Sequence, residues 1–144
     1  MDRKPTLAVP EGPYLACASD YALACFNAIC ISLTDAGYEL KRVKVMDDYQ
    51  MIRDRQDAIM SFDAANVHKE WFAKYSTLYS PKFTDLIKRG QSITNSQLQT
   101  ALRARDAFRN QITQAMNENN IDLVLLVNFS SVFIVLLFVF PVPF

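Results

Sequence analysis

The chain has 144 residues, of which 51% are hydrophobic, and this is enough for one domain with its own core. Fifteen basic and fifteen acidic residues balance and are interspersed, so nothing in the charge favours a nucleic-acid partner. The three cysteines have no CxxC spacing and the only histidine, His68, lies far along the chain, which argues against a zinc site.

The first third of the chain predicts a strand–helix–strand unit. A short apolar run between prolines predicts a strand over Thr6–Val9. Ser19 or Asp20 can cap a helix whose apolar residues recur at helical spacing, and this helix should end just before Gly37, the expected left-handed residue. Alternating apolar and basic residues predict a half-buried strand over Glu39–Val45. The order predicts two parallel strands joined by a helix.

The middle of the chain predicts helices rich in aromatic residues. Asp47-Asp48 can open a helix that runs to about Tyr75, and Ser80-Pro81 breaks it. One or two further turns are expected over Phe83–Arg89, with Gly90 ending them. The aromatic residues expected to anchor packing against another layer are Phe62, Trp71, Phe72, Tyr75 and Tyr79.

The segment Thr94 to Leu126 gives the clearest pattern. Thr94 and Gln97 have the spacing of a capping box, in which two side chains satisfy free backbone N–H groups reciprocally. Behind them, apolar residues recur at three- and four-residue steps as far as Met116. A polar turn over Asn117–Asn120 leads to a candidate buried strand over Ile121–Leu126. Helix, short turn and apolar strand are typical of an α/β protein.

The C-terminal tail differs in character. Leu123–Phe140 carries no charge, and as a helix it would span about 27 Å, marginally enough to cross a bilayer. A tail-anchored protein with a soluble α/β head is therefore an alternative, although the start of this segment is also a good buried strand. No secretory leader follows Met1, so we expect a cytoplasmic, reducing location and buried thiols at Cys17, Cys25 and Cys30.

A series of landmarks follows the strand–helix–strand unit in a fixed order. Gly90-Gln91-Ser92-Ile93-Thr94 comes first, then Leu98, Ala101 and Arg105, then Asp122-Leu123-Val124-Leu125. This series resembles the amidase signature family, and the resemblance covers roughly residues 5 to 125. It implies a large mixed sheet flanked by helices. It also implies a hydrolase or amidotransferase that acts on carboxamide C–N bonds through a Ser–cis-Ser–Lys triad.

The departures from the family pattern carry equal weight. The family's catalytic lysine and Gly/Ser-rich segment lie before the part that matches, and the resemblance stops at Leu126-Val127, where the family has Thr-Pro. Ser130-Ser131 lacks surrounding glycines and receives no catalytic role. We therefore expect residues 1–126 to be a partial amidase-like α/β domain and residues 127–144 a hydrophobic tail of uncertain origin. A frame change or a retained intron is one hypothesis for this tail.

The resulting functional hypothesis is a fragment of an amidase-type hydrolase that is inactive alone. No catalytic, cofactor-binding or metal-binding residue is assigned within it. The full-length parent would act on a small-molecule amide, and this chain would need the missing N-terminal half or a partner subunit. A plain binding module that pairs with a catalytic partner is the other alternative, beside the membrane anchor.

Isolated candidates for chemistry have structural explanations that we favour. His68 could be a base but is interpreted as a surface histidine, and Asp54 with Asp57 as part of a solvated charged helix face. Arg105 lies within the apolar stripe, so we expect it to form a buried pair with a neighbouring layer. The serines that sit at caps, turns or helix faces, without the context of a nucleophile, are Ser19, Ser61, Ser76, Ser92 and Ser96.

Overall fold

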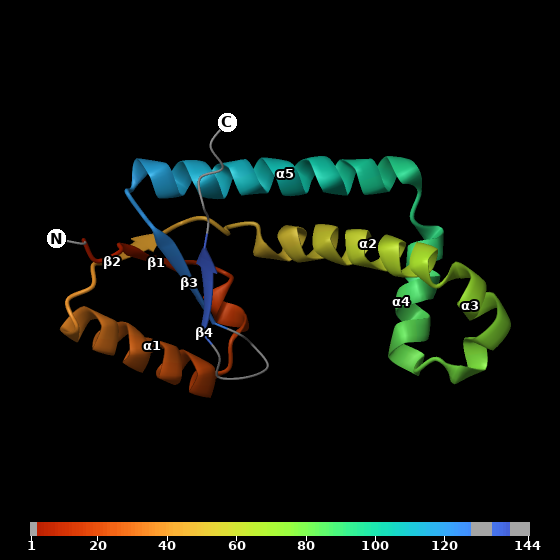
Figure 1. Ribbon diagram of the computed structural model, residues 1–144, viewed down its shortest axis with the longest axis horizontal. Helices are drawn as coiled ribbons and strands as arrows, with labels where there is room; N and C mark the ends of the chain where they lie inside the picture. The colour runs from red at the N-terminus through yellow and green to blue at the C-terminus, as the bar shows by residue number, and fades with distance from the viewer. Residues whose placement is uncertain (1–2, 128–133, 139–144) are drawn as a thin grey trace. The chain divides into compact units, whose positions relative to one another are not determined.

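The computed structural model describes residues 3–127 and the backbone of residues 134–138. It confirms the predicted α/β class, a mixed sheet with flanking helices (Figure 1). Two compact units are present, one formed by Met1–Tyr49 with Arg109–Phe144 and the other by Gln50–Phe108. The elements in chain order are β1 (Leu7–Pro10), η1 (Leu15–Cys17), α1 (Asp20–Asp35), β2 (Leu40–Val43), α2 (Tyr49–Val67), α3 (Lys69–Tyr75), η2 (Ser76–Leu78), α4 (Pro81–Ser92), α5 (Asn95–Glu118), β3 (Leu123–Val127) and β4 (Ile134–Phe138).

The sheet of the first unit has the strand order β2-β1-β3-β4. The strands β1, β2 and β3 are parallel, and β4 runs antiparallel to β3. Leu7 lies in register with Leu40 on one side and Leu123 on the other, so β1 is a central strand. Its side chains are buried, as expected of an apolar run in a parallel sheet with both faces covered.

The helix α1 covers one face of this sheet, and the C-terminal end of α5 lies on the opposite face (Figure 1). Both predicted ends of α1 are confirmed. The Ser19 side chain accepts a hydrogen bond from the backbone N–H of Ala22 at 3.3 Å. Gly37 has φ +80°, a left-handed conformation that glycine adopts without steric cost. Phe26, only 2% exposed, is the main side chain that α1 inserts into the core.

The predicted helix from Asp47 to Tyr75 is wrong in one respect, because it is broken at His68 into α2 and α3. His68 has φ −95° and ψ 7°, outside the helical range, although its carbonyl still accepts a hydrogen bond from the N–H of Phe72. The break lets the imidazole join a cluster of aromatic rings. Trp71 and Tyr75, expected to anchor packing, are instead more than half exposed.

The predicted end of a helix at Gly90 is also wrong. The helix α4 begins at Pro81 behind the N-cap Ser80 and continues through Gly90 to Ser92. Gly90 is buried because α4 meets α2 there, and a Cβ atom at Gly90 would lie 1.9 Å from the carbonyl oxygen of Ser61. This glycine admits a neighbouring backbone and does not terminate its own helix.

The capping box at the start of α5 is confirmed. The N–H of Gln97 donates to Thr94 Oγ1 at 3.3 Å, and the N–H of Thr94 donates to Gln97 Oε1 at 2.8 Å. The strand β3 follows α5 as predicted, but it begins two residues later and ends one residue later than expected. Among the described residues, no helix is long and apolar enough to cross a membrane. Ser130-Ser131 lies outside the described residues.

Candidate functional site

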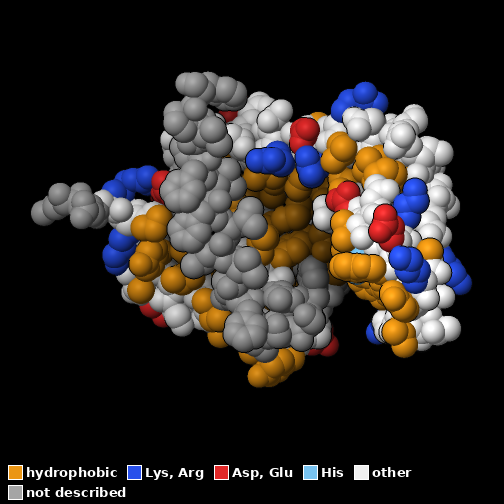
Figure 2. Space-filling view, turned by 45° about the vertical axis from the view of Figure 1, so that its right-hand side comes forward, with side chains coloured by type: hydrophobic (Ala, Val, Ile, Leu, Met, Phe, Trp, Pro, Cys, Tyr) orange, Lys and Arg blue, Asp and Glu red, His pale blue; other side chains and the backbone are white. Residues whose placement is uncertain are grey.

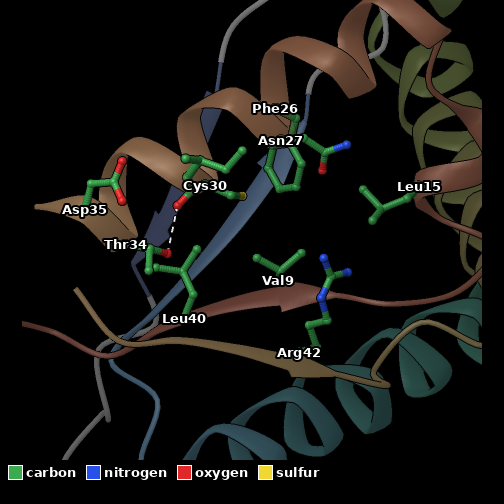
Figure 3. A pocket seen from close by; sticks show the side chains of 10 residues that line it. Val9, Leu15, Phe26, Asn27, Cys30, Thr34, Asp35, Leu40 and Arg42 are labelled. Atoms are coloured by element: carbon green, nitrogen blue, oxygen red, sulfur yellow. Dashed lines mark hydrogen bonds between the residues drawn. The ribbon is translucent and has the colours of Figure 1, made fainter. Parts of the chain in front are cut away.

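A groove between α1 and the strands β1 and β2 has a volume of about 330 Å³ (Figure 3). It lies in the sheet unit, and the strands contribute the side chains of Val9, Leu40 and Arg42. The helix side is mixed in character, with Phe26 at the base and polar groups toward the C-terminal end of α1. The residues that line the groove are Val9, Leu15, Phe26, Asn27, Cys30, Ile31, Thr34, Asp35, Leu40 and Arg42.

Among its described lining residues, the groove lacks an activated nucleophile. Burial raises the pKa of the Cys30 thiol, and the nearby Arg42 guanidinium only partly opposes this effect, so the thiol is protonated at neutral pH. Thr34 donates its hydroxyl proton to the Cys30 carbonyl at 3.0 Å. Arg42 pairs with Glu11 at 3.8 Å. The lining residues include no histidine or lysine that could activate a nucleophile.

The cysteines do not match the expectation of three buried thiols. Cys17 is exposed, and Cys25 and Cys30 are only half-buried. For Cys25 and Cys30 the reason is that α1 buries few residues deeply, mainly Ala22 and Phe26, whereas Cys17 lies in η1. Within residues 3–127, no three side chains of His, Cys, Asp or Glu gather in an arrangement that could hold a metal ion.

Tyr14 contacts the carboxyl end of β3, an interaction that the sequence did not predict. Its hydroxyl donates to the carbonyl of Val127, the last residue of β3, at 2.7 Å. The ring packs edge-on against Tyr49, with 5.2 Å between ring centroids. Burial is the main cause that raises the pKa of Tyr14 to about 12. Tyr14 is therefore a structural hydrogen-bond donor and is not suited to acid–base exchange near neutral pH.

Asp122 organises the opposite end of the sheet. Its carboxylate accepts the N–H of Thr6 at 2.7 Å and the guanidinium of Arg3 at 2.8 Å. The Thr6 backbone hydrogen bond, followed by Arg3, lowers the pKa of Asp122. This residue belongs to the landmark series quoted above, and its position shows a role in joining β3 to the start of β1.

His68 is not the surface histidine that was expected. It is half-buried, its Nδ1 atom lies 2.9 Å from the Tyr79 hydroxyl, and Phe83 packs edge-on against it at 5.0 Å between centroids. Trp71 makes a similar edge contact at 5.8 Å. The imidazole serves as a packing and hydrogen-bonding residue between α3, η2 and α4, and no serine or cysteine lies among these partners.

The serine candidates have the structural roles that were favoured. Ser19 caps α1, Ser92 donates to the carbonyl of Arg89 at 2.7 Å, and Ser61 is buried on α2 beside α4. Ser76 begins η2, and Ser96 lies in the first turn of α5. Within residues 3–127, no hydrogen bond joins a serine hydroxyl to a lysine or histidine side chain.

The charged candidates divide into one confirmed and one wrong interpretation. Asp54 and Asp57 are on a solvated helix face, and Asp57 also pairs with Arg89 of α4 at 3.0 Å. Arg105 does not form the buried pair that was expected. Its side chain is 44% exposed and contacts the adjacent Asp106 at 3.3 Å. At Arg105 this face of α5 is therefore open to solvent, whereas Ala101 and Met116 of the same stripe are buried.

The comparisons with known proteins support the fold. No protein-family model and no curated protein matches the sequence. Among solved structures, an amidase crystal structure matches with a TM-score of 0.74 and 17% identity, covering 88% of this chain and 28% of that chain. An inhibitor-bound structure, described as an unexpected vestigial protein complex that reveals the evolutionary origins of an s-triazine catabolic enzyme, matches with a TM-score of 0.68 and 14% identity. Its coverage is again 88% of this chain and 28% of that chain, and a second structure under the same description matches equally well.

These matches define the class of fold. The chain has an amidase-like α/β fold over most of its length, and it spans about 28% of the length of the solved chains that it matches. At 14–17% identity, the similarity concerns the fold alone.

Proposed function

We propose that this chain is a scaffold portion of an amidase-type enzyme, derived from the amidase signature family, that does not cleave amide bonds by itself. The observation that carries this proposal is that 88% of the chain superimposes on only 28% of an amidase. In the proposal, residues 1–126 carry the amidase-like part, residues 127–144 are an added apolar tail, and the complete enzyme hydrolyses the C–N bond of a small carboxamide.

The chemistry of the described residues supports the proposal. Amide hydrolysis needs a nucleophile within hydrogen-bond reach of a base, together with converging N–H donors for the developing oxyanion. Cys30 is held as a neutral thiol, and His68 is surrounded by aromatic rings in the other compact unit. Among the serines of residues 3–127, Ser19 and Ser80 cap helices, Ser32 and Ser92 bond to backbone carbonyls, and Ser61 is buried between helices.

Release of ammonia by the purified chain tests this function. Simple carboxamides are the substrates, and the expected rate equals that of a blank preparation. The Ser130→Ala and Ser131→Ala variants are the controls, because activity from a contaminating amidase would survive both substitutions. Turnover by the chain that either substitution abolishes would overturn the proposal.

A second candidate function is that of a non-catalytic partner subunit. Two of the matched structures are described as a vestigial protein complex, and this description favours a chain that acts by association. We therefore propose that a further polypeptide completes the fold. Mixing the chain with a separately purified amidase segment that carries the catalytic lysine and serines should restore ammonia release. A mixture that forms no complex would count against this candidate.

A further inference from the structure

The outer edge of β2 presents backbone groups away from the sheet. The N–H of Leu7 donates to the Glu39 carbonyl and the N–H of Glu11 donates to the Val43 carbonyl, each at 2.8 Å. Successive residues of a strand direct their backbone groups to alternate sides, so Leu40 and Arg42 direct theirs away from β1. Within the described residues, β2 is at the end of the sheet and pairs with β1 alone.

The groove described above adjoins this same edge. The side chains of Leu40 and Arg42 line it from the strand, facing Cys30 and Thr34 of α1 (Figure 3). Ile31, which also lines the groove, is 63% exposed. A strand added beside β2 would therefore gain backbone hydrogen bonds and would place alternate side chains at the groove, as in recognition by strand addition.

The charge of the edge selects the occupant. Lys41, Arg42 and Lys44 make three of residues 40–44 basic. Lys41 lies 3.6 Å from Glu39 and Arg42 lies 3.8 Å from Glu11, but the Arg42 side chain is still 67% exposed. Pairing β2 with a second copy of itself would bring like charges together, which disfavours a homodimer at this edge. Residues 127–144 contain no acidic residue, so the tail of this chain cannot supply the complementary charge either.

We propose that the outer edge of β2 and the adjoining groove bind an extended acidic segment of a separate polypeptide, which adds a strand to the sheet. The geometry specifies an apolar residue opposite Leu40 and acidic residues opposite Lys41 and Arg42. The inference deepens the proposed function and rests on it, since the bound polypeptide is the one that completes the amidase-type fold.

Other features of the molecule do not point to an occupant as clearly. The end of α2, α3 and η2 carry exposed hydrophobic residues three or four positions apart: Val67, Trp71, Tyr75 and Leu78. Figure 2 shows hydrophobic side chains gathered at the surface of the helical region on its right-hand side. Among the described residues, no open strand edge accompanies this stripe to define what covers it, whereas the β2 edge has one.

Fluorescence anisotropy with synthetic peptides tests the proposal on the full chain. The probe is a short labelled peptide of valine and threonine with one central pair of glutamates, and the matched probe has lysines in place of the glutamates. We expect the glutamate peptide to bind about tenfold more tightly than the lysine peptide, and added salt to weaken it. Equal binding of both peptides would overturn the proposal.

Three variants of Arg42 distinguish the contribution of its charge from that of the backbone hydrogen bonds of an added strand. Arg42→Glu should reverse the preference in favour of the lysine peptide, and because this side chain is exposed, the substitution should leave the fold intact. Arg42→Pro removes an outward N–H and should abolish binding of the glutamate peptide, whereas Arg42→Gln, which loses the charge alone, should only weaken it. Binding that survives Arg42→Pro in a folded chain would refute strand addition.

Failure of this inference is distinguishable from failure of the proposed function. Amide turnover by the chain alone would overturn the function without changing the peptide affinities. Loss of the peptide preference would overturn the inference and leave the ammonia assay as it was.

Discussion

Gly90 gives the sharpest test of the packing between α2 and α4. A Cβ atom at this position would lie 1.9 Å from the Ser61 carbonyl oxygen and 2.8 Å from the Ala65 Cβ. The nearest atom belongs to the backbone, so no side-chain rotation can relieve the contact. Gly90→Ala would therefore push α4 away from α2 by about 1 Å and loosen Ile87, which is fully buried on the same helix.

Two opposing contributions set the size of the effect. Replacing glycine with alanine inside a helix favours folding by about 1 kcal/mol. Overpacking typically costs about 1–3 kcal/mol, and a contact with backbone belongs at or above the upper end of that range. We expect a net destabilisation of about 2 kcal/mol, which lowers the melting temperature by roughly 4–8 °C for a chain of this size.

Urea denaturation of the full chain, followed by circular dichroism and by the fluorescence of Trp71, measures this effect. Trp71 is the only tryptophan and lies in the same compact unit as Gly90. Gln91→Ala, on an exposed site of α4, is the matched control and should change stability by less than about 0.5 kcal/mol. Adding Ala65→Gly to Gly90→Ala should restore little, since the Ser61 carbonyl remains. A Gly90→Ala chain as stable as the parent would refute the close packing of α2 and α4.

Three further predictions concern single side chains. Tyr14→Phe should lower the free energy of unfolding by about 1–2 kcal/mol, because the buried Val127 carbonyl loses its donor. In the parent chain, the stabilisation by Tyr14 should decline as pH rises from 10.0 toward about 12. Urea midpoints of both chains, measured over this pH range, check both effects. Because the pKa of Asp122 is lowered in the fold, its ionised carboxylate stabilises the fold above the ordinary carboxyl pKa, and this stabilisation is lost as pH falls through the lowered pKa. The urea midpoints of the parent and Asp122→Asn should therefore converge on acidification. A difference that stays constant with pH would contradict the hydrogen bond between Thr6 and Asp122. Arg105→Leu should change the free energy of unfolding by less than about 0.5 kcal/mol, because the side chain is largely exposed. A large loss of stability would instead support the buried pair that the sequence predicted.

The features that the sequence predicted correctly depend on neighbours close along the chain. Ser19 and Gly37 mark the two ends of α1 because a cap and a left-handed residue act within a few positions. Thr94 and Gln97 form their box for the same reason. The parallel pairing of β1 and β2 followed from a strand, helix and strand with short connections, a local order with few solutions.

The features that were wrong depend on partners far along the chain. Gly90 looked like a helix end, and a glycine that admits another helix gives the same pattern in one sequence. The sequence around His68 has no signal for a helix break. The contacts of the imidazole are made with Tyr79 and Phe83, which come later in the chain. Arg105 lay in a periodic apolar stripe, but periodicity shows which residues share a face and not whether another layer covers that face.

The groove could not be predicted for a similar reason. Its lining combines residues of β1, β2 and α1, which are brought together by the strand order and the packing of the helix. The alternation of apolar and basic residues over 40–44 was visible in the sequence, yet it was interpreted as an ordinary half-buried strand. The edge position, which gives this alternation its possible use, is a property of the topology.

The central position of β1 has a consequence for synthesis on the ribosome. β1 can pair with β2 once Val43 has emerged, but its other neighbour, β3, begins only at Leu123. Translation at about 5–20 residues per second leaves that second edge of β1 open for roughly 4–16 seconds. During this interval an apolar strand is available to chaperones or to other nascent chains, and the Tyr14 hydroxyl has no Val127 carbonyl to bind until β3 has been synthesised.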